Sequence, residues 1–411
     1  MRGILKAVLI SVCAVLIAAT AGFVLLFAVY CLPTEPMFEN AKDDQYDLYY
    51  WSLENTSQLD PYSEDAMVNT AIYSGDESVL EQTVMNYHMG GPDLGSIRSL
   101  DMYLKGEDGM VREDYTRYWH GYLVYLKPLL SVLSISRIKV LQMSLQLLML
   151  FAVVLCIYKR NGLMTALAFF ISMLVVNPVS MAICIEFANI YNIMLIAILV
   201  MYRFELFESG KVWKLFLGVG ICVAYFDLMS FPLLSLAIPL ILYLVNSRED
   251  GRTQFGAVCA SSFAWVFGYG GMWVSKWVIS DLIYHNGALS ESFSQVAMRS
   301  SGGQDAAEST GIFDAVTGNL GSLSIGILLF FFIFTVYLFV LIWKRRNSLD
   351  EKAVKGSLMP LLIGLYPFVW MIVVREHSAA HHFFAHRLFA ITFLALLVTF
   401  TGIAESGKAK E

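Results

Sequence analysis

The sequence predicts an all-α, polytopic membrane protein with about ten transmembrane helices, organised as a single membrane domain over residues 1–411. Three observations predict this class. Apolar residues make up 57% of the 411 residues, charged residues make up 15%, and the mean hydropathy is +0.61. Apolar runs approaching the roughly 20 residues that a helix needs to cross a bilayer recur along the chain. Lys and Arg gather in alternate connections between these runs. A soluble domain of this length would not carry so much apolar surface.

The first apolar run, residues 7–32, follows Arg2 and Lys6. It is longer than the apolar core of a signal peptide, which has about 7–15 residues. We therefore expect a retained membrane anchor.

Residues 33–120 form a long polar segment after this anchor. It is too long for a plain connection, so it should fold into elements of its own. The apolar stripe that follows Ser63 predicts one helix, with acidic residues in its first turn. Residues 78–87 predict a second helix, which Gly90-Gly91-Pro92 ends. With 18 Asp and Glu against five Lys and Arg, the segment should not bind anionic headgroups.

Apolar sequence resumes at residue 121. Residues 121–134 are too few for a full span and contain Lys127-Pro128, which predicts a short helix at the membrane interface. Nine full spans are expected after it, at about residues 138–158, 163–185, 187–202, 215–231, 233–245, 257–279, 323–343, 358–374 and 388–404. The connection 281–322 is rich in Ser, Gly and Ala, with Gly302-Gly303 near its middle, and is expected to be flexible.

The basic residues predict the orientation. Lys and Arg fall in the connections on the same side as the amino terminus, which the positive-inside rule assigns to the cytoplasm. The chain is thus expected in the cell membrane with both termini cytoplasmic, and residues 33–120 and 281–322 are expected to be extracytoplasmic. All seven histidines then lie on the outer side, which predicts that chemistry takes place there.

The candidate site residues come from several outer segments. Three carboxylates, Asp60, Glu64 and Asp65, lie within six residues. Charged groups held against a bilayer are costly unless they serve a function. The cationic and histidine candidates expected to bind substrate are Arg117, His120, Lys276, Arg299, Arg375, His377, His381 and Arg387.

Five short stretches together resemble polytopic glycosyltransferases of the GT-C superfamily, in particular an uncharacterised bacterial branch of membrane proteins. They are LDPYSED at 59–65, RYWHGYLVYLKPLL at 117–130, YFDLMSFPL at 225–233, WVSKW at 273–277 and REHSAAHHFFAHR at 375–387. Pro61, Asp65 and Glu376 depart from the patterns of that branch. The resemblance implies a GT-C-like fold, a polyprenyl-phosphate-linked sugar as donor, and an envelope glycan or lipid as acceptor.

The resemblance also implies roles for the candidates. An outer-loop carboxylate takes the acceptor proton, so Asp60 or Glu64 would be the base, with Asp65 as a third candidate. Cations hold the departing phosphate, and Arg does so with a planar fork. Arg375, His381 and Arg387 would contact the phosphate, while Arg117, His120, Lys276 and Arg299 would line the approach, and His377 is included with the substrate-binding group.

Each of these roles has an alternative. The acids could serve only a helix start, Lys276 could extend to the headgroups, and Asp227 could be a hydrogen-bonding residue at a helix end. The spacing of His377 with His381, and of His382 with His386, leaves a divalent metal open, although neither a zinc-type cysteine motif nor HExxH occurs.

Two other functions also stay open: a transporter or flippase for an envelope lipid or sugar, and a non-catalytic subunit of an envelope assembly complex. The absence of visible repeats argues against the transporter. No nucleic-acid partner is expected, because no patch of basic residues lies outside the cytoplasmic membrane edge.

Overall fold

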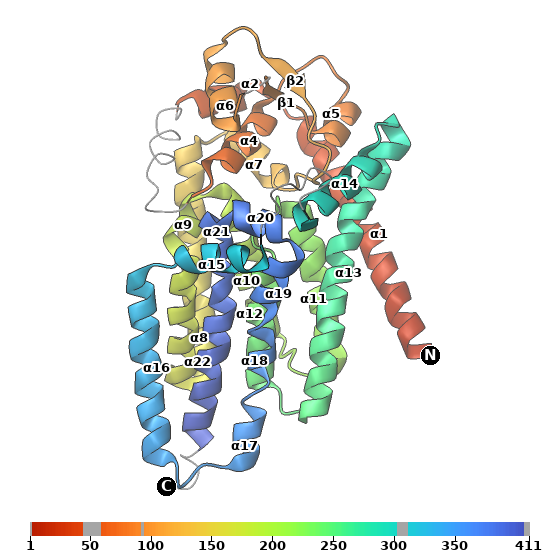
Figure 1. The fold of residues 1–411 in the computed structure, drawn as a ribbon. Helices are drawn as coiled ribbons and strands as arrows, with labels where there is room; N and C mark the ends of the chain where they lie inside the picture. The colour runs from red at the N-terminus through yellow and green to blue at the C-terminus, as the bar shows by residue number, and fades with distance from the viewer. Residues whose placement is uncertain (1, 44–58, 92–93, 302–310, 407–411) are drawn as a thin grey trace.

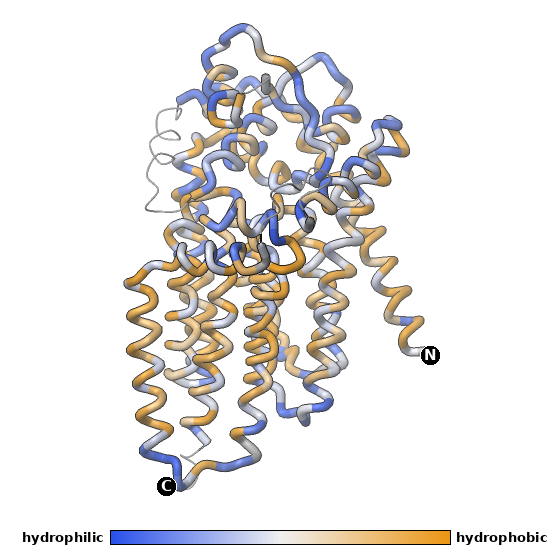
Figure 2. The backbone as a smooth tube through the Cα atoms, viewed as in Figure 1, coloured by the Kyte–Doolittle hydropathy of each residue, from blue (hydrophilic) through white to orange (hydrophobic). Residues whose placement is uncertain are grey.

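The computed structural model describes residues 2–43, 59–91, 94–301 and 311–406. It has a bundle of long helices and, at one end of the bundle, a polar layer of short helices with a small sheet (Figure 1). Apolar residues dominate the long helices, whereas hydrophilic residues concentrate in the polar layer and at the opposite ends of the helices (Figure 2). This division is the one expected if the bundle lies in lipid and the polar layer lies in water.

Seven helices of the described chain are long and apolar enough to cross a membrane, and they indicate a multi-pass membrane protein. Six of these crossings contain α1 (Arg2–Tyr30), α8 (Ile135–Val176), α10 (Ile185–Arg203), α13 (Gly251–Tyr284), α16 (Ile325–Arg345) and α22 (Phe389–Ser406). The seventh, Val354–Val373, combines the end of α17 (Glu351–Gly356) with α18 (Pro360–Ile363) and α19 (Tyr366–Val373). Two other helices of the bundle are α11 (Ser209–Phe226) and α12 (Leu233–Asn246).

Helix α8 reverses direction at Gly162, whose φ of 84° and ψ of 176° are not helical. Both ends of α8 lie near the polar layer. Gln142 donates to the carbonyl of Ala182 there (2.9 Å), and the Val176 carbonyl meets the start of α22. Asn161, beside the break, instead contacts Asn246 at the far end of α12 (3.0 Å). Glycine adopts this positive φ without the steric cost that a side chain would add.

The polar layer contains two strands that the sequence analysis did not predict. Its elements are α2 (Glu35–Asp43), α4 (Pro61–Ile72), α5 (Val79–Met85), β1 (His88–Gly90), α6 (Ser96–Lys105), β2 (Val111–Glu113) and α7 (Leu123–Leu130). The helices expected after Ser63 and over residues 78–87 are present as α4 and α5. Strands β1 and β2 pair antiparallel, with His88 opposite Glu113 and Gly90 opposite Val111. Helix α7 is too short to span a membrane, as expected.

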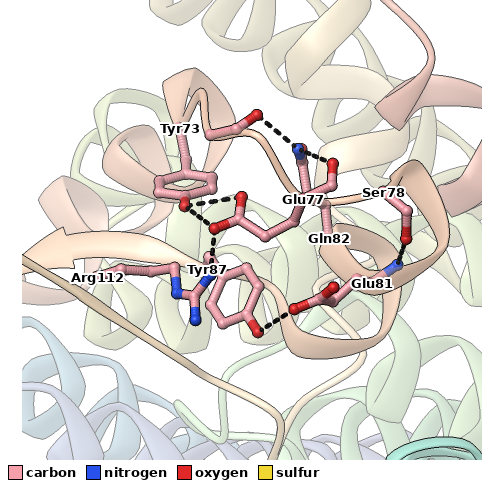
Figure 3. A network of polar contacts seen from close by, with 8 residues as sticks. Tyr73, Glu77, Ser78, Glu81, Gln82, Tyr87 and Arg112 are labelled. Atoms are coloured by element: carbon pink, nitrogen blue, oxygen red, sulfur yellow. Dashed lines mark hydrogen bonds and ion pairs between the residues drawn. The ribbon is translucent and has the colours of Figure 1, made fainter.

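A polar network ties β2 to α5 and to the residue that ends α4 (Figure 3). The hydroxyl of Tyr73 donates to the carboxylate of Glu77 (3.0 Å), and Arg112 forms an ion pair with the same carboxylate. The hydroxyl of Tyr87 donates to Glu81 (2.9 Å), and the Arg112 guanidinium lies 4.3 Å from the centre of the Tyr87 ring. These contacts hold the short elements together at the outer side of the layer's apolar core, which includes Met67, Ile72 and Leu104.

A third set of short helices lies between the polar layer and the bundle (Figure 1). It consists of α9 (Pro178–Ile183), α14 (Ala288–Ser301), α15 (Ile312–Gly321), α20 (Arg375–Ala380), α21 (His382–Ala385) and η1 (His386–Leu388). The connection expected to be flexible over residues 281–322 therefore contains α14 and α15. Its Gly302-Gly303 pair lies outside the described residues.

Helices α11 and α13 cross at close range. A Cβ atom at Gly220 of α11 would overlap the carbonyl oxygen of Trp265, and one at Gly268 of α13 would overlap the carbonyl oxygen of Leu217. Small residues at such crossings let two backbones approach each other in a membrane, where packing drives association. The crossing fixes α13, which reaches up to the polar layer.

Candidate functional site

A cavity of about 630 Å³ lies where the polar layer meets the bundle. Its walls come from the start of α4, the segment after β2, the start of α10, the turn after α11, and helices α14, α20 and α21. Its acidic and basic lining residues are Asp60, His88, Glu113, Asp114, Arg117, Glu186, Arg299, His377 and His381. The structure thus brings together five residues that the sequence analysis selected, namely Asp60, Arg117, Arg299, His377 and His381.

Asp60 is positioned as the N-cap of α4. Its Oδ1 accepts a hydrogen bond from the backbone N–H of Ser63 (3.1 Å), and its Oδ2 accepts one from the Ser63 hydroxyl (2.8 Å). Pro61 follows at the start of the helix, where its missing N–H costs nothing. The residue is only 4% exposed. The cap therefore fixes a buried carboxyl group at the wall of the cavity.

Glu186 completes a carboxyl pair with Asp60. It lies in the first turn of α10, is 2% exposed, and its side chain lies beside that of Asp60. Its Oε2 has no hydrogen-bond partner among the described residues. The two carboxyl groups therefore lie side by side at the wall of the cavity.

The sequence analysis did not select Glu186. The spans expected at 163–185 and 187–202 end and begin on either side of it. An acidic residue inside apolar sequence is itself a functional signal. That signal could have identified Glu186.

Two guanidinium groups also line the cavity. Arg299, on α14, lies above the ring of Tyr118 (5.8 Å to the ring centre) and contacts the Met229 sulfur (2.9 Å). Arg117 lies 5.3 Å from the centre of the Tyr115 ring, and its Nε is buried without a hydrogen-bond partner in the described part of the chain. Both cations are oriented mainly by aromatic rings, which leaves N–H donors for an anion.

The rings of His377 and His381 lie against each other on the same wall, with their centres 4.5 Å apart. His377 donates from Nε2 to the Met229 carbonyl (3.0 Å). Burial, followed by the charges of His381 and Arg299, lowers the pKa of His377 to about 3. Burial also lowers the pKa of His381, whose Nδ1 is buried without a partner among the described residues. Neutral imidazoles of this kind can orient a substrate by hydrogen bonds.

Asp227 shapes the wall without lining it. Its Oδ2 accepts from the backbone N–H groups of Met229 (2.8 Å) and Ser230 (3.0 Å), and its Oδ1 accepts from the Ser230 hydroxyl (2.7 Å). These bonds hold Met229 at a positive φ of 73°, an uncommon conformation for a residue with a side chain. Met229 in turn contacts Arg299 and His377. The helix-end interpretation of Asp227 therefore agrees with its contacts.

The other two carboxyl candidates lie outside the cavity lining. Glu64 forms an ion pair with Lys139 of α8 (2.5 Å). Asp65 is 7% exposed, and its burial, together with the neighbouring charge of Glu64, raises its pKa to about 8. Lys139 acts in the opposite direction but does not offset the burial.

His120 and Lys276 support the polar layer from within. The ring of His120 contacts the Tyr122 hydroxyl through Nδ1 and the Tyr115 carbonyl through Nε2, both at 2.8 Å. Lys276 donates to the carbonyl of Val84 (2.7 Å) and to the Asn86 side chain (2.6 Å) at the end of α5. Neither residue lines the cavity, and Lys276 is 2% exposed, so it does not extend to the headgroups.

The two arginines that flank the last outer segment lie apart from the lining as well. Arg375 approaches Glu376 (3.4 Å) at the start of α20. Arg387 is fully buried, donates to the carbonyl of Val176 (3.1 Å), and lies 4.5 Å from the centre of the Phe187 ring. Its guanidinium thus joins η1, which directly precedes α22, to the end of α8.

The described residues contain no group of three or more His, Cys, Asp or Glu arranged to hold a metal ion. In the second histidine pair, His382 contacts the Ser322 hydroxyl through Nδ1 (2.9 Å), and Nδ1 of His386 contacts the carbonyl of His382 (3.1 Å).

No protein-family model, curated protein or solved structure matches the chain.

Proposed function

We propose that the chain is an integral membrane glycosyltransferase, which transfers a sugar from a polyprenyl-phosphate donor to an envelope glycan or lipid. One observation carries the proposal. The neighbouring carboxyl groups of Asp60 and Glu186 share a cavity with Arg117 and Arg299 at the membrane end of the polar layer. A carboxylate and nearby cations are the groups that glycosyl transfer from a phosphate requires.

The proposed topology has ten crossings in a GT-C-like arrangement. The seven long helices supply seven, and the segment of α8 after Gly162, together with α11 and α12, supplies three more. The polar layer is then extracytoplasmic and both termini are cytoplasmic. Reporter domains fused at the exposed Gly106 and after residue 411 should report opposite sides of the membrane. Reporters on the same side would refute this orientation.

The proposed reaction assigns the base to Asp60. Its carboxylate takes the proton of the acceptor hydroxyl as the acceptor oxygen bonds to the anomeric carbon. The bond from that carbon to the phosphate oxygen breaks, and the electron pair leaves with the polyprenyl phosphate. Ser63 positions the Asp60 carboxylate through two hydrogen bonds, and Glu186 lies beside it in the cavity wall. Glu64 is a weaker candidate for the base because its charge is already matched by Lys139.

The cations receive the departing phosphate. Arg117 and Arg299 present guanidinium groups to the cavity, and a guanidinium can hold two phosphate oxygens at once. His377 and His381, neutral at physiological pH, orient the sugar or phosphate by hydrogen bonds. Because the cavity lies at the end of the bundle, the polyprenyl chain can remain in the bilayer while the sugar enters the polar layer.

The test is sugar transfer by the purified full chain in proteoliposomes, with a panel of polyprenyl phosphates carrying radiolabelled hexoses or pentoses and an envelope extract as acceptor. Asp60→Asn retains an N-cap residue of nearly equal strength, so α4 should remain folded. Loss of a general base should reduce the transfer rate by about 10²–10⁴-fold. Donor binding, measured separately by filtration, should change little.

The matched control is Asp108→Asn, which removes an exposed carboxylate from the same polar layer. It should leave transfer unchanged. Near-normal transfer by Asp60→Asn would exclude Asp60 as the base. Failure of the wild-type chain to release polyprenyl phosphate from any donor in the panel would refute the proposed donor class.

A further inference from the structure

A second cavity, of about 510 Å³, lies at the opposite end of the bundle from the carboxyl pair. It is enclosed by the Gly162 break of α8, the end of α12, the start of α13, α18 and the last turns of α22. Arg160 and Arg248 line it together with Glu249, Glu405 and Thr401. The cavity therefore combines two cations and two carboxylates at a membrane edge.

The cations of this cavity face a second hollow as well. A neighbouring cavity of about 930 Å³ shares Arg160, Arg248 and Glu249 with the first and adds Lys159. The two cavities thus meet along one polar wall. A ligand bound in the first cavity can therefore extend into the second.

The two arginines are arranged differently. Arg160 is oriented by Asn246, which accepts from its Nε (2.8 Å), by Glu205, and by the ring of Phe207, whose centre lies 4.3 Å away. Arg248 is exposed, and its side chain forms no hydrogen bond or ion pair with the described residues. One guanidinium is therefore held in place at the wall, and the other can close over a ligand.

A buried hydroxyl group points to the same place. Thr401 is 2% exposed and lines the cavity, yet its Oγ1 has no hydrogen-bond partner among residues 2–43, 59–91, 94–301 and 311–406. In α1, by contrast, Thr20 donates to the carbonyl four residues earlier (2.9 Å). Leaving a buried hydroxyl unpaired costs stability. A ligand oxygen in the cavity would satisfy it.

The remaining lining is suited to a lipid. Val245, Val398 and Pro360 provide apolar walls beside the charged groups. We propose that this cavity binds the headgroup of a zwitterionic phospholipid. Arg160 and Arg248 hold the phosphate, Thr401 donates to a phosphate or glycerol oxygen, and the carboxylates of Glu249 and Glu405 receive the ammonium group. The site is separate from the proposed transfer reaction and does not depend on it.

The ligand's charge pattern explains the choice of class. An anionic headgroup would meet the two carboxylates as well as the two arginines. Phosphoethanolamine carries one charge of each sign, which matches the lining. Glu249 already accepts a hydrogen bond from the Tyr243 hydroxyl (2.7 Å), which holds its carboxylate toward this region.

Native mass spectrometry of the full chain in detergent tests the proposal, with phosphatidylethanolamine titrated as the probe. One lipid should be retained. Arg248→Ala should weaken retention by about ten-fold, and Thr401→Val by about five-fold, as expected for loss of one hydrogen bond to a charged group or to a neutral one. Thermal stability without lipid should not fall in Thr401→Val, because this hydroxyl has no protein partner in the described chain.

Two matched controls separate a site from a general lipid belt. Thr399 is a second buried threonine of α22 whose hydroxyl has no partner in the described chain, but it does not line the cavity. Arg252 is an exposed arginine at the same end, outside both cavities. Thr399→Val and Arg252→Ala should retain the lipid as the wild type does.

Three results would overturn the proposal. If all four variants retained the lipid equally, the proposed site would be refuted. If the wild type retained phosphatidylglycerol as well as phosphatidylethanolamine, the proposed role of the carboxylates would be refuted. Displacement of the lipid by millimolar inorganic phosphate, with protection against thermal unfolding by phosphate alone, would assign the cavity to a soluble phosphate instead.

Discussion

Lys139 Nζ lies 2.5 Å from Glu64 Oε1, so the first long segment of α8 is ion-paired to helix α4 of the polar layer. Both side chains are largely buried, with 13% and 6% exposure. This ion pair distinguishes Glu64 from Asp60. The carboxyl group of Asp60, four residues earlier, faces the cavity instead. Two acids that look equivalent in the sequence thus have different surroundings.

We predict that Glu64→Gln destabilises the fold. It leaves the Lys139 ammonium buried without its carboxylate, and breaking a buried ion pair from one side costs about 3–5 kcal/mol. The melting temperature in detergent should fall. The double variant Glu64→Gln, Lys139→Met should recover most of the loss, because it removes both charges. Unchanged melting of Glu64→Gln would show that the pair contributes little.

Asp65 predicts a pH dependence of stability. Its pKa rises from 3.8 in the unfolded chain to about 8 in the folded protein, chiefly through burial, with Glu64 adding to the shift and Lys139 opposing it. Between these values the folded state binds more protons than the unfolded state. The contribution of Asp65 to the free energy of unfolding therefore falls as the pH rises from about 4 to about 8.

Asp65→Asn should remove this dependence, because an amide does not titrate. Melting temperatures of both proteins should therefore diverge as the pH rises from 6 to 9, with the variant more stable at the alkaline end. The comparison between the two proteins cancels the effect of the buried histidines on stability, because both proteins contain them. Their lowered pKa values affect stability only at acidic pH. If the melting temperatures of the two proteins changed in parallel between pH 6 and pH 9, Asp65 would not carry a proton in the folded state.

The crossing of α11 and α13 gives a packing prediction. Gly220→Ala and Gly268→Ala would each place a methyl group against a backbone carbonyl of the other helix. Overpacking of this kind typically costs about 1–3 kcal/mol. The controls are Gly218→Ala and Gly270→Ala on the same helices, where a Cβ meets nothing within 4 Å. These should stabilise slightly, by up to about 1 kcal/mol, since alanine favours a helix. Equal melting of all four variants would refute the close crossing.

Hydropathy located the helices of the bundle well, because a bilayer demands long apolar runs. It was less accurate at breaks. The span expected over 163–185 ends at Val176 and is followed by α9, and the span expected over 358–374 contains two short helices, α18 and α19. Positive-φ residues and short turns decide these details, and neither alters the average hydropathy.

The site was only partly predictable for a different reason. A sequence shows that a charge lies near a membrane edge, but not which way it faces. Lys276, flanked by Trp273 and Trp277, has the pattern of an interfacial residue, yet it reaches the end of α5. Arg387 lies where the last span begins, yet it bonds to a backbone carbonyl of α8. Tertiary packing determined both directions.

The last prediction concerns the cation proposed to hold the donor phosphate. Arg299 projects from α14 into the cavity, where it contacts the Tyr118 side chain and the Met229 sulfur. Arg299→Lys preserves the charge but not the planar fork, so it should weaken binding of a polyprenyl-phosphate analogue by about 10–100-fold, the value of a hydrogen bond to a charged group. Arg98→Lys, at the surface of the polar layer, is the matched control and should bind normally. Arg387→Lys provides a second comparison. Because its guanidinium is occupied by the Val176 carbonyl, it should lower the melting temperature more than the affinity. If Arg387→Lys lost affinity at unchanged stability while Arg299→Lys bound normally, the phosphate would lie at the start of α22 and not beneath α14.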